Sequence, residues 1–391
     1  MWLGKSAVVG VGLSKFGKRE DASLRELAAE AVYESFQDAR DIEPGDVEAV
    51  IVASSQPERL VVQSHVAPLI CEYLGVKPSK GAFRVESACS SGGVALRMAD
   101  IMIRSGEASK VLVVGVEKMT EAPRSEVMTT LSIVGDKDWE SIHGITAPAG
   151  FALAAQRHML EYGTKEEHLG LVAVKNHANA ELNPKAMFRR RITLNEYKDS
   201  PPIARPLKLL DCSPICDGAS CVILTDAEDA RKYNDTPVVV KSITQTTIGN
   251  SSTTVDDLTT WKPLVEAASR AYSLAGISPK QVDVAEVHDC FTIAEIIEYE
   301  DLGFCGKGYG GRFVEEGQSA IGGEVAVNTS GGLKAKGHPI GATGIAQVVE
   351  ITLQLRGEAG KRQVSGADIG LTHNLGGFAV NHVVGIYGRM T

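Results

Sequence analysis

The chain carries the same local pattern twice, and this internal repeat constrains its fold more than any other feature. The segments 91–108 and 342–359 each run from a small-residue turn through a helical stretch to a second glycine that Glu-Ala follows. The matching positions, equal in order and spacing, are Gly93, Ala95 and Gly106 in the first copy and Gly344, Ala346 and Gly357 in the second. We therefore expect two similar halves.

The repeat extends upstream and indicates a class of fold. The paired segments are the predicted helices 24–38 and 263–275, the stretches 42–50 and 277–285 that follow them, and the strands 110–114 and 367–372. Helices that alternate with short Val/Ile-rich strands are typical of a parallel α/β sheet with both faces covered. We expect an α/β protein in which the two copies pack as one layered pair.

Residues 119–210 fit neither copy. This stretch is rich in proline, predicts helices near 150–162 and 165–180, and contains the basic run Arg189, Arg190 and Arg191. We interpret it as an inserted loop domain that covers an active-site mouth. The basic run is either a solvated face or a subsite for ligand phosphates. The predicted division is 1–118 and 211–234 for the first half, 119–210 for the insertion, and 235–391 for the second half.

Composition excludes several classes of protein. The 391 residues are 43% hydrophobic and 23% charged, and a net charge of −9 argues against nucleic-acid or membrane partners. No apolar stretch approaches the roughly 18 residues of a membrane span. We expect no leader peptide, because the strand-like Ser6–Gly10 follows Met1 closely. Seven cysteines without paired spacing predict reduced thiols in a cytoplasm, and Cys212, Cys216 and Cys221 lack a histidine to complete a zinc pattern.

The segment Val85-Glu-Ser-Ala-Cys-Ser-Ser-Gly-Gly93 contains the first candidate catalytic residue, Cys89. The stretch 81–85 predicts a strand, and the apolar periodicity after Gly93 predicts a helix. Cys89 would then lie on a tight strand-to-helix turn, where backbone N–H groups and the helix dipole favour an anion. We expect its pKa to lie below the roughly 8.5 of a free cysteine. The alternative is a buried cysteine beside a packing turn.

Two histidine segments belong to the second copy. Glu286-Val-His-Asp-Cys-Phe291 follows a predicted strand, and Ser330–Gly344 contains Gly337-His-Pro339. In the repeat alignment His338 falls two places before the equivalent of Cys89, so pseudo-symmetric halves would bring both turns face to face. His338 can then take the Cys89 proton. Each histidine segment alone is more often structural.

A further glycine turn is predicted at Thr372–Gly377, after the strand of the second copy. Its backbone N–H groups are suited to line an oxyanion site.

Together these motifs resemble those of the thiolase family over essentially the whole chain. The resemblance rests on Val114–Met119, Cys216–Ser220, Gly337-His-Pro339 and the Cys89 turn. It is strongest to the branch of sterol-carrier-protein-2-type thiolases and archaeal acetyl-CoA acetyltransferases. The family implies a thiolase fold, in which two duplicated mixed βα halves form an αβαβα arrangement with an inserted loop domain.

The chain departs from the general family pattern at two places. His288-Asp-Cys290-Phe stands where most thiolases carry Asn-Glu-x-Phe, and Asn374-Leu-Gly376 stands where they carry a catalytic Cys-x-Gly. In the branch that this chain resembles, the cysteine of His-Asp-Cys-Phe takes over the acid/base role, which here falls on Cys290.

The resemblance implies a ping-pong Claisen condensation. Cys89 accepts an acyl group from an acyl-CoA, and Cys290 removes the α-proton of a second acetyl-CoA. His288 and His338 stabilise its enolate, and the N–H groups of Cys89 and Gly376 hold the oxyanion of the acyl group. The implied activity is an acetyl-CoA C-acetyltransferase that needs no cofactor or metal besides its coenzyme A substrates.

The resemblance also suggests residues around the substrate. Arg189, Arg190 or Arg191 would meet CoA phosphates, and His143 and Met119 would lie near the pantetheine. The residues expected to narrow the acyl pocket are Met119, Met128, Ile145 and Phe151. We therefore expect short acyl groups, acetyl first.

Several alternatives stay open. A 3-ketoacyl-CoA thiolase of longer chains would share every motif, and a ketosynthase would share Cys89, His288 and His338 but needs neither a second cysteine nor a large CoA lid. A 3-hydroxy-3-methylglutaryl-CoA synthase would need a glutamate in place of Cys290. Gly10-Val-Gly12 does not indicate the dinucleotide-binding turn of a dehydrogenase, because Lys15 stands where the third glycine of that motif belongs.

Partners are implied by the resemblance alone. We expect a cytoplasmic homodimer or homotetramer. The alternative is a scaffold role, which could also coexist with catalysis. In that role the chain would form a complex with 3-hydroxy-3-methylglutaryl-CoA synthase through a small zinc-containing OB-like protein.

Overall fold

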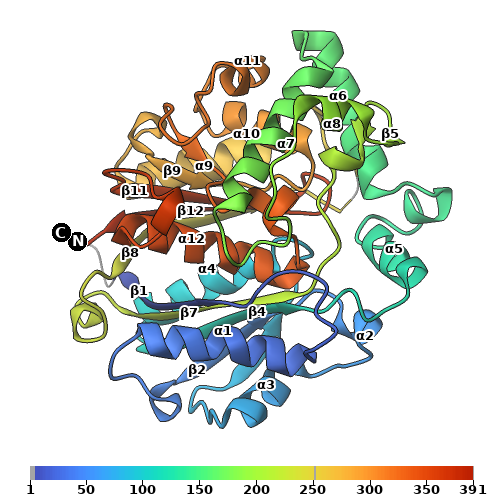
Figure 1. Cartoon of the computed structure of the whole chain (residues 1–391). Helices are drawn as coiled ribbons and strands as arrows, with labels where there is room; N and C mark the ends of the chain where they lie inside the picture. The colour runs from blue at the N-terminus through green and yellow to red at the C-terminus, as the bar shows by residue number, and fades with distance from the viewer. Residues whose placement is uncertain (1–4, 251, 391) are drawn as a thin grey trace.

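The computed structural model describes residues 5–250 and 252–390, which form a layered α/β structure (Figure 1). The first half contains β1 (Ser6–Leu13), α1 (Leu24–Asp38), β2 (Ala49–Ala53), α2 (Pro57–Leu60), α3 (Val66–Leu74), β3 (Ala82–Val85), α4 (Ser91–Arg104), β4 (Lys110–Glu117) and β7 (Gly218–Asp226). The second half contains β8 (Val238–Thr247), α9 (Lys262–Ala275), β9 (Val284–Glu286), α10 (Thr292–Asp301), α11 (Gly310–Glu315), β10 (Ala326–Val327), α12 (Thr343–Arg356), β11 (Ile369–Gly376) and β12 (Asn381–Arg389).

The strand order confirms the duplication. The first half runs β3-β2-β4-β7-β1 and the second runs β10-β9-β11-β12-β8, so each strand has a counterpart at the same place. The two five-stranded sheets join edge to edge, in one ten-stranded order, where β1 pairs with β8 through Ala7↔Val239 and Val8↔Val238. The sheets are mixed rather than parallel: in the first half β2, β3 and β4 are parallel, β7 is antiparallel to β4, and β1 is antiparallel to β7. In the second half β12 follows β11 through a short turn and so runs antiparallel to it, whereas in the first half the stretch 119–210 separates β4 from the antiparallel β7.

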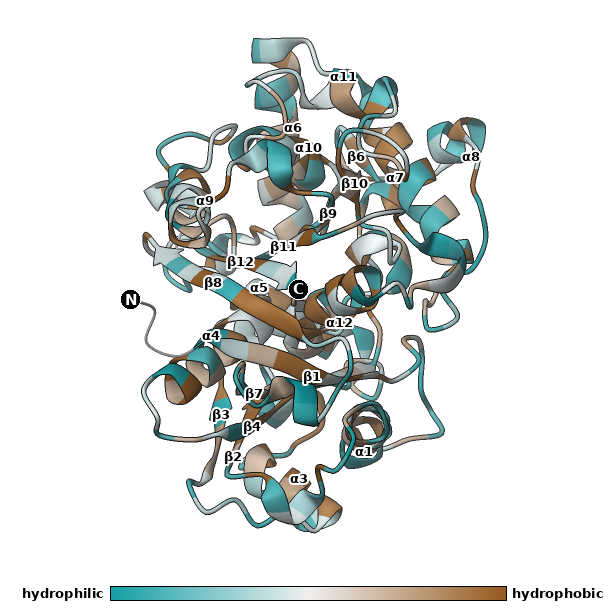
Figure 2. Ribbon diagram, turned by 90° about the vertical axis from the view of Figure 1, so that its left-hand side faces the viewer, coloured by the Kyte–Doolittle hydropathy of each residue, from teal (hydrophilic) through white to brown (hydrophobic). Residues whose placement is uncertain are grey.

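The central layer consists of α4 and α12, which lie between the two sheets (Figure 1). Helix α1 covers the outer face of the first sheet and α9 that of the second. Apolar colour follows the strands, while much of the periphery is hydrophilic (Figure 2). Every residue of β1 is buried, as expected for a strand covered on both faces. None of the described helices is long and apolar enough to cross a membrane.

Because α12 is buried on nearly every side, its polar side chains need partners inside the protein. Gln347 donates to the carbonyl of His373 at 2.8 Å, and Glu350 accepts from Arg362 Nε at 2.9 Å. These bonds tie the central helix to the second sheet and to the turn that follows it.

The stretch 119–210 lies over one end of the layers. It contains α5 (Arg124–Ser132), α6 (Ala147–Tyr162), α7 (Glu166–Glu181), α8 (Leu194–Asp199), β5 (Pro202–Ala204) and β6 (Leu207–Lys208). The helices predicted near 150–162 and 165–180 are confirmed as α6 and α7. The exact division at 118, 210 and 234 stays a prediction.

Glycines allow the two central helices to approach each other at their N-terminal ends. A Cβ at Gly344 would lie 2.4 Å from the backbone nitrogen of Gly93 and 2.2 Å from Asn374 Oδ1. A Cβ at Gly92 would lie 2.9 Å from the nitrogens of Gly344 and Ile345. No side chain fits at this crossing, so the repeat keeps glycine there in both copies.

We predict that Gly344→Ala lowers the free energy of unfolding by about 1–3 kcal/mol, the range for overpacking. The new methyl group would meet backbone atoms that cannot move alone. Chemical denaturation followed by circular dichroism measures the loss. Gly306→Ala is the matched control, because a Cβ there meets nothing within 4 Å. Equal stability of both variants would contradict the close crossing.

Candidate active site

Cys89 lies on the predicted turn between β3 and α4. Ala88 has a positive φ of 49°, which is strained for a residue with a side chain and sharpens the turn. Hydroxyl groups hold this shape: Ser90 Oγ donates to Ser87 O at 2.7 Å, and Ser91 Oγ donates to Ala88 O at 2.6 Å. The local sequence thus presents Cys89 at the start of a central helix.

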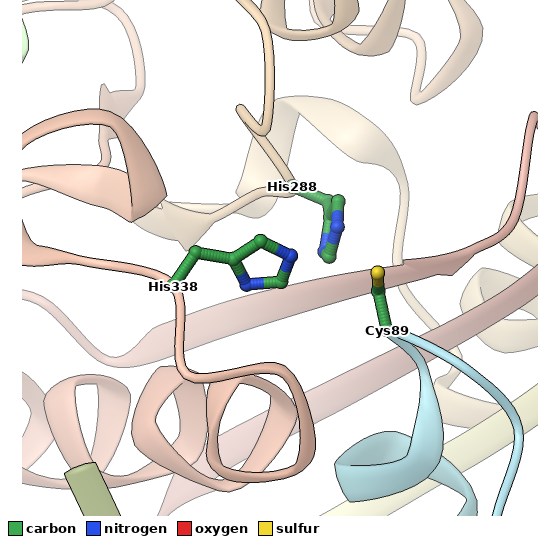
Figure 3. A group of neighbouring side chains, drawn as sticks. All are labelled: Cys89, His288 and His338. Atoms are coloured by element: carbon green, nitrogen blue, oxygen red, sulfur yellow. The ribbon is translucent and has the colours of Figure 1, made fainter. Parts of the chain in front are cut away.

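Cys89, His288 and His338 come together from three segments of the chain (Figure 3). The sulfur of Cys89 and one ring nitrogen of each histidine all lie within 4.8 Å of one another. The imidazole rings meet edge to face, with centroids 5.1 Å apart. His288 follows β9 and His338 precedes α12, so both halves contribute to one site.

Cys290 is buried beside this group. Burial raises its pKa well above the usual value, and the negative charge of an ionised Cys89 raises it further. The structure therefore brings four of the predicted site residues together. Cysteine and histidine are also zinc ligands, and Cys89, His288 and His338 are the three that could approach a metal ion.

The pKa expected for Cys89 is wrong in direction. Burial raises the pKa of the thiol to about 12, and the nearby carboxylates Glu117 and Glu86 contribute. Removal from water outweighs the helix dipole, because the dipole is worth only about 0.3–1 kcal/mol at most sites. Cys89 thus rests as a neutral thiol that needs a base.

Both histidines are neutral at physiological pH. Burial lowers the pKa of His338 to about 3, with help from the positive charge of Lys336. Burial lowers the pKa of His288 well below its usual value, and a charge on His338 would lower it further. A neutral imidazole can accept a proton on one nitrogen and donate one from the other.

Glu117 couples the two halves at this site. Its buried carboxylate accepts from the backbone nitrogens of Ser55 at 2.8 Å and of Gly341 at 3.0 Å. Burial raises its pKa to about 7, although these hydrogen bonds oppose the rise. Glu117 thereby holds the segment between His338 and α12 against the end of β4.

Three contacts, made by two residues, were not predicted. Asn374 Nδ2 lies 3.0 Å from Cys89 O and 3.2 Å from His288 Nδ1, and His338 Nδ1 lies 2.6 Å from Thr343 Oγ1. A signal existed for Asn374, since it replaces the cysteine expected in Cys-x-Gly. Nothing in the sequence pattern singled out Thr343.

The glycine turn predicted at Thr372–Gly377 lies elsewhere. β11 continues through Gly376, and the chain turns only after it, because β12 extends the pairing to Gly376↔Asn381. Gly376 nevertheless packs on the cysteine turn, where a Cβ would lie 2.4 Å from Ser90 Oγ.

Two residues of the basic run carry carboxylate partners on the surface. Arg190 pairs with Glu196 at 2.9 Å and Arg191 pairs with Glu181 at 2.7 Å. The segment just before Arg189 is fixed near residues 330–338, the segment that ends at His338 and is called the histidine loop below, since Phe188 N donates to Ala335 O at 3.0 Å.

The residues expected around the substrate divide into two groups. Met119 is buried in an apolar cluster against which Cys89 packs, and Phe151 stacks on Phe291 with centroids 4.6 Å apart. His143, Met128 and Ile145 are exposed instead. Because Met128 and Ile145 face solvent, they do not narrow a buried pocket in this structure.

All seven cysteines, each within the described part of the chain, are free. Cys216 and Cys221 are buried, whereas Cys212 is only partly buried. Cys216 Sγ accepts from the backbone nitrogen of His338 at 3.1 Å, so it supports the histidine loop.

The comparisons with known proteins agree with this architecture. The thiolase N-terminal domain family matches residues 6–228, and the thiolase C-terminal domain-like family matches 244–389. The chain therefore belongs to the thiolase family.

Among its relatives, the chain is 45% identical to an acetyl-CoA acetyltransferase of Methanothermobacter thermautotrophicus, over 98% of this chain and 99% of that protein. It is 37% identical to bovine sterol carrier protein 2, over 94% of this chain and 69% of that protein.

Two solved structures are similar over nearly the whole chain. The Ltp2-ChsH2(DUF35) aldolase matches with a TM-score of 0.86 and 26% identity, covering 99% of both chains. Human mitochondrial 3-ketoacyl-CoA thiolase matches with a TM-score of 0.77 and 18% identity, covering 100% of both chains. The second match supports the fold alone.

We predict that alkylation of Cys89 accelerates with pH and reaches no plateau up to about pH 9.5. The raised pKa favours the protonated thiol, so the thiolate fraction grows about tenfold per pH unit below that pKa. Peptide mass spectrometry after timed exposure to iodoacetamide measures the rate at Cys89 alone. Free glutathione in the same buffers is the control. A plateau with a midpoint near pH 7 would contradict the neutral thiol.

Proposed function

We propose that this chain is an acetyl-CoA C-acetyltransferase, which joins two acetyl-CoA molecules reversibly into acetoacetyl-CoA and free CoA. The observation that carries the proposal is the convergence of Cys89, His288 and His338 within 4.8 Å, with Cys290 buried beside them. The 45% identity to an acetyl-CoA acetyltransferase over nearly the whole chain supports the same reaction.

The first half-reaction transfers an acetyl group to Cys89. His338 takes the thiol proton, and the thiolate attacks the thioester carbonyl carbon. The carbonyl oxygen becomes an oxyanion, for which the backbone N–H groups of Cys89 and Gly376 are the proposed donors. When the intermediate collapses, the C–S bond to CoA breaks. Cys290 rests as a thiol, so it is suited to give its proton to the leaving CoA thiolate.

The second half-reaction forms the carbon–carbon bond. The Cys290 thiolate removes an α-proton from a second acetyl-CoA, and the enolate oxygen accepts from His288 and the protonated His338. The enolate carbon attacks acetyl-Cys89, and the acetyl–sulfur bond breaks. Cys89 then recovers its proton from His338, so every group returns to its starting state.

Short acyl groups are the proposed substrates. Met119 is 2% exposed and lies in the apolar cluster that contacts Cys89, so it is the residue proposed to limit the acyl chain. The alternative is a 3-ketoacyl-CoA thiolase of longer chains. Thiolysis rates for substrates of four and of eight or more carbons decide between them, and a preference for the longer ones would defeat this assignment.

For CoA we propose Arg189, Arg190 and Arg191 as phosphate contacts, with Met119 near the pantetheine. Arg190 and Arg191 would have to exchange their glutamate partners for phosphate, which exposed pairs do at small cost. His143 stays a proposal from resemblance alone. No cofactor or metal is assigned to the reaction.

For assembly we propose a cytoplasmic homodimer or homotetramer. The sheet edge at β3, whose residues are all only partly buried, supports pairing with a second copy. A bridging OB-like protein to 3-hydroxy-3-methylglutaryl-CoA synthase is the proposed further partner. The name of a similar solved structure, the Ltp2-ChsH2(DUF35) aldolase, pairs two components, which supports a partner protein for this chain. Light scattering of the purified chain measures the oligomer.

Cys89 and Cys290 act in different steps of the reaction, so removing each thiol should impair different half-reactions. Cys89→Ala should abolish both exchange of labelled CoA into acetyl-CoA and acetoacetyl-CoA thiolysis. Cys290→Ala should retain exchange, because the CoA thiolate is a good leaving group that can depart without a general acid. It should lose condensation by about 10²-fold or more, the scale for removing a general base.

The control for this pair is Cys71→Ala, which removes a buried thiol in α3 outside the site and should keep both rates. If Cys290→Ala condenses at the wild-type rate, the base lies elsewhere. If Cys89→Ala still exchanges CoA, the acyl-enzyme proposal is wrong.

A further inference from the structure

We propose that Asn374 and Thr343 are positioning residues that hold the two active-site histidines in opposite neutral tautomers. His288 would carry its proton on Nε2 and His338 would carry its proton on Nδ1. The catalytic consequence rests on the proposed acetyltransferase function, whereas the tautomers themselves follow from hydrogen-bond geometry.

Two backbone groups fix the orientation of the Asn374 amide. Gly93 N–H can only donate, and it lies 2.9 Å from Asn374 Oδ1. Cys89 C=O can only accept, and it lies 3.0 Å from Asn374 Nδ2. A flipped amide would place donor against donor and acceptor against acceptor. The start of α4 and the cysteine turn thus select one orientation.

That orientation determines the tautomer of His288. The amide nitrogen of Asn374 has two N–H groups, one for Cys89 O and one for His288 Nδ1 at 3.2 Å. Because the amide nitrogen cannot accept, Nδ1 must accept, and the proton of the neutral ring lies on Nε2. His288 is then a fixed N–H donor at Nε2.

Thr343 gives the opposite result for His338. Its hydroxyl oxygen lies 3.0 Å from Pro339 O and 2.6 Å from His338 Nδ1. Pro339 O can only accept, and it also accepts from the backbone nitrogens of Ala342 and Thr343. We assign the single hydroxyl proton to Pro339 O, so that a lone pair of the hydroxyl oxygen faces Nδ1. His338 Nδ1 therefore carries the proton, and Nε2 presents a lone pair.

The opposite tautomers match the two tasks of the site. The lone pair on His338 Nε2 can take the Cys89 proton, and the N–H on His288 can donate to the enolate oxygen. With the tautomers exchanged, the histidine beside the nucleophile would have no lone pair to offer. A proton on His288 Nε2 also opposes metal binding by that nitrogen, since a ligand nitrogen must be free.

Nitrogen NMR of the whole protein, with histidine rings labelled with ¹⁵N, tests this without substrate. Loss of one signal set in His288→Gln and in His338→Gln assigns the two rings among the nine histidines. We expect Nε2–H for His288 and Nδ1–H for His338 at pH 7.5. The same tautomer on both rings would overturn the inference.

Paired variants test the positioning role. Asn374→Asp keeps the shape but offers only acceptors, so His288 should change to Nδ1–H. Condensation should fall about 10²-fold, the scale for losing an oxyanion donor, with little change in the KM for acetyl-CoA. A His288 that keeps Nε2–H in this variant overturns the role of Asn374.

On the other side of the site, Thr343→Val removes the hydroxyl while keeping the shape, and Thr343→Ser restores it. His338 should lose its Nδ1–H preference in the valine variant and regain it with serine. This pair keeps the test valid if Asn374→Asp does not fold. If the histidines have opposite tautomers but the protein does not exchange CoA, only the proposed function is contradicted. If the protein is an active enzyme but both histidines have the same tautomer, only this inference is contradicted.

Discussion

The contact between the N-terminal ends of α4 and α12 is the constraint on which the rest of the structure depends. Gly92 and Gly93 meet Gly344 with no space for a Cβ, and the Asn374 amide lies against the same crossing. The turns that precede these helices carry Cys89 and His338. The crossing of two equivalent helices thus places a nucleophile from one half beside a base from the other.

The same central position determines the electrostatics. Within a site between two sheets, burial favours the neutral thiols of Cys290 and of the partly buried Cys89, and it favours the neutral rings of both histidines. Protons must then pass between neighbours during the reaction. Fixed hydrogen bonds determine where each proton starts, which is why amide and hydroxyl groups around the imidazoles matter as much as the rings.

The sequence pattern predicts the two halves and the position of the site correctly, but it does not predict properties that depend on how deeply a side chain is buried. The repeat predicted equivalent halves, and alignment of Gly93 with Gly344 placed Cys89 opposite His338. The pKa of Cys89 was wrong, because helix position can be deduced from sequence but the depth of the thiol cannot. Met128 and Ile145 were assigned to a pocket by residue type alone, and the structure exposes them. The contacts of Asn374 depend on long-range pairing that no local pattern encodes.

Peptide mass spectrometry of the protein after incubation with acetyl-CoA alone tests the central claim most directly. The claim is that the duplicated halves create a nucleophile at Cys89 and at no other cysteine. We expect an added acetyl group on the Cys89 peptide and unmodified thiols at the other six positions, with loss of the adduct when free CoA is added. Acetylation of a different cysteine, or of none, would contradict the account.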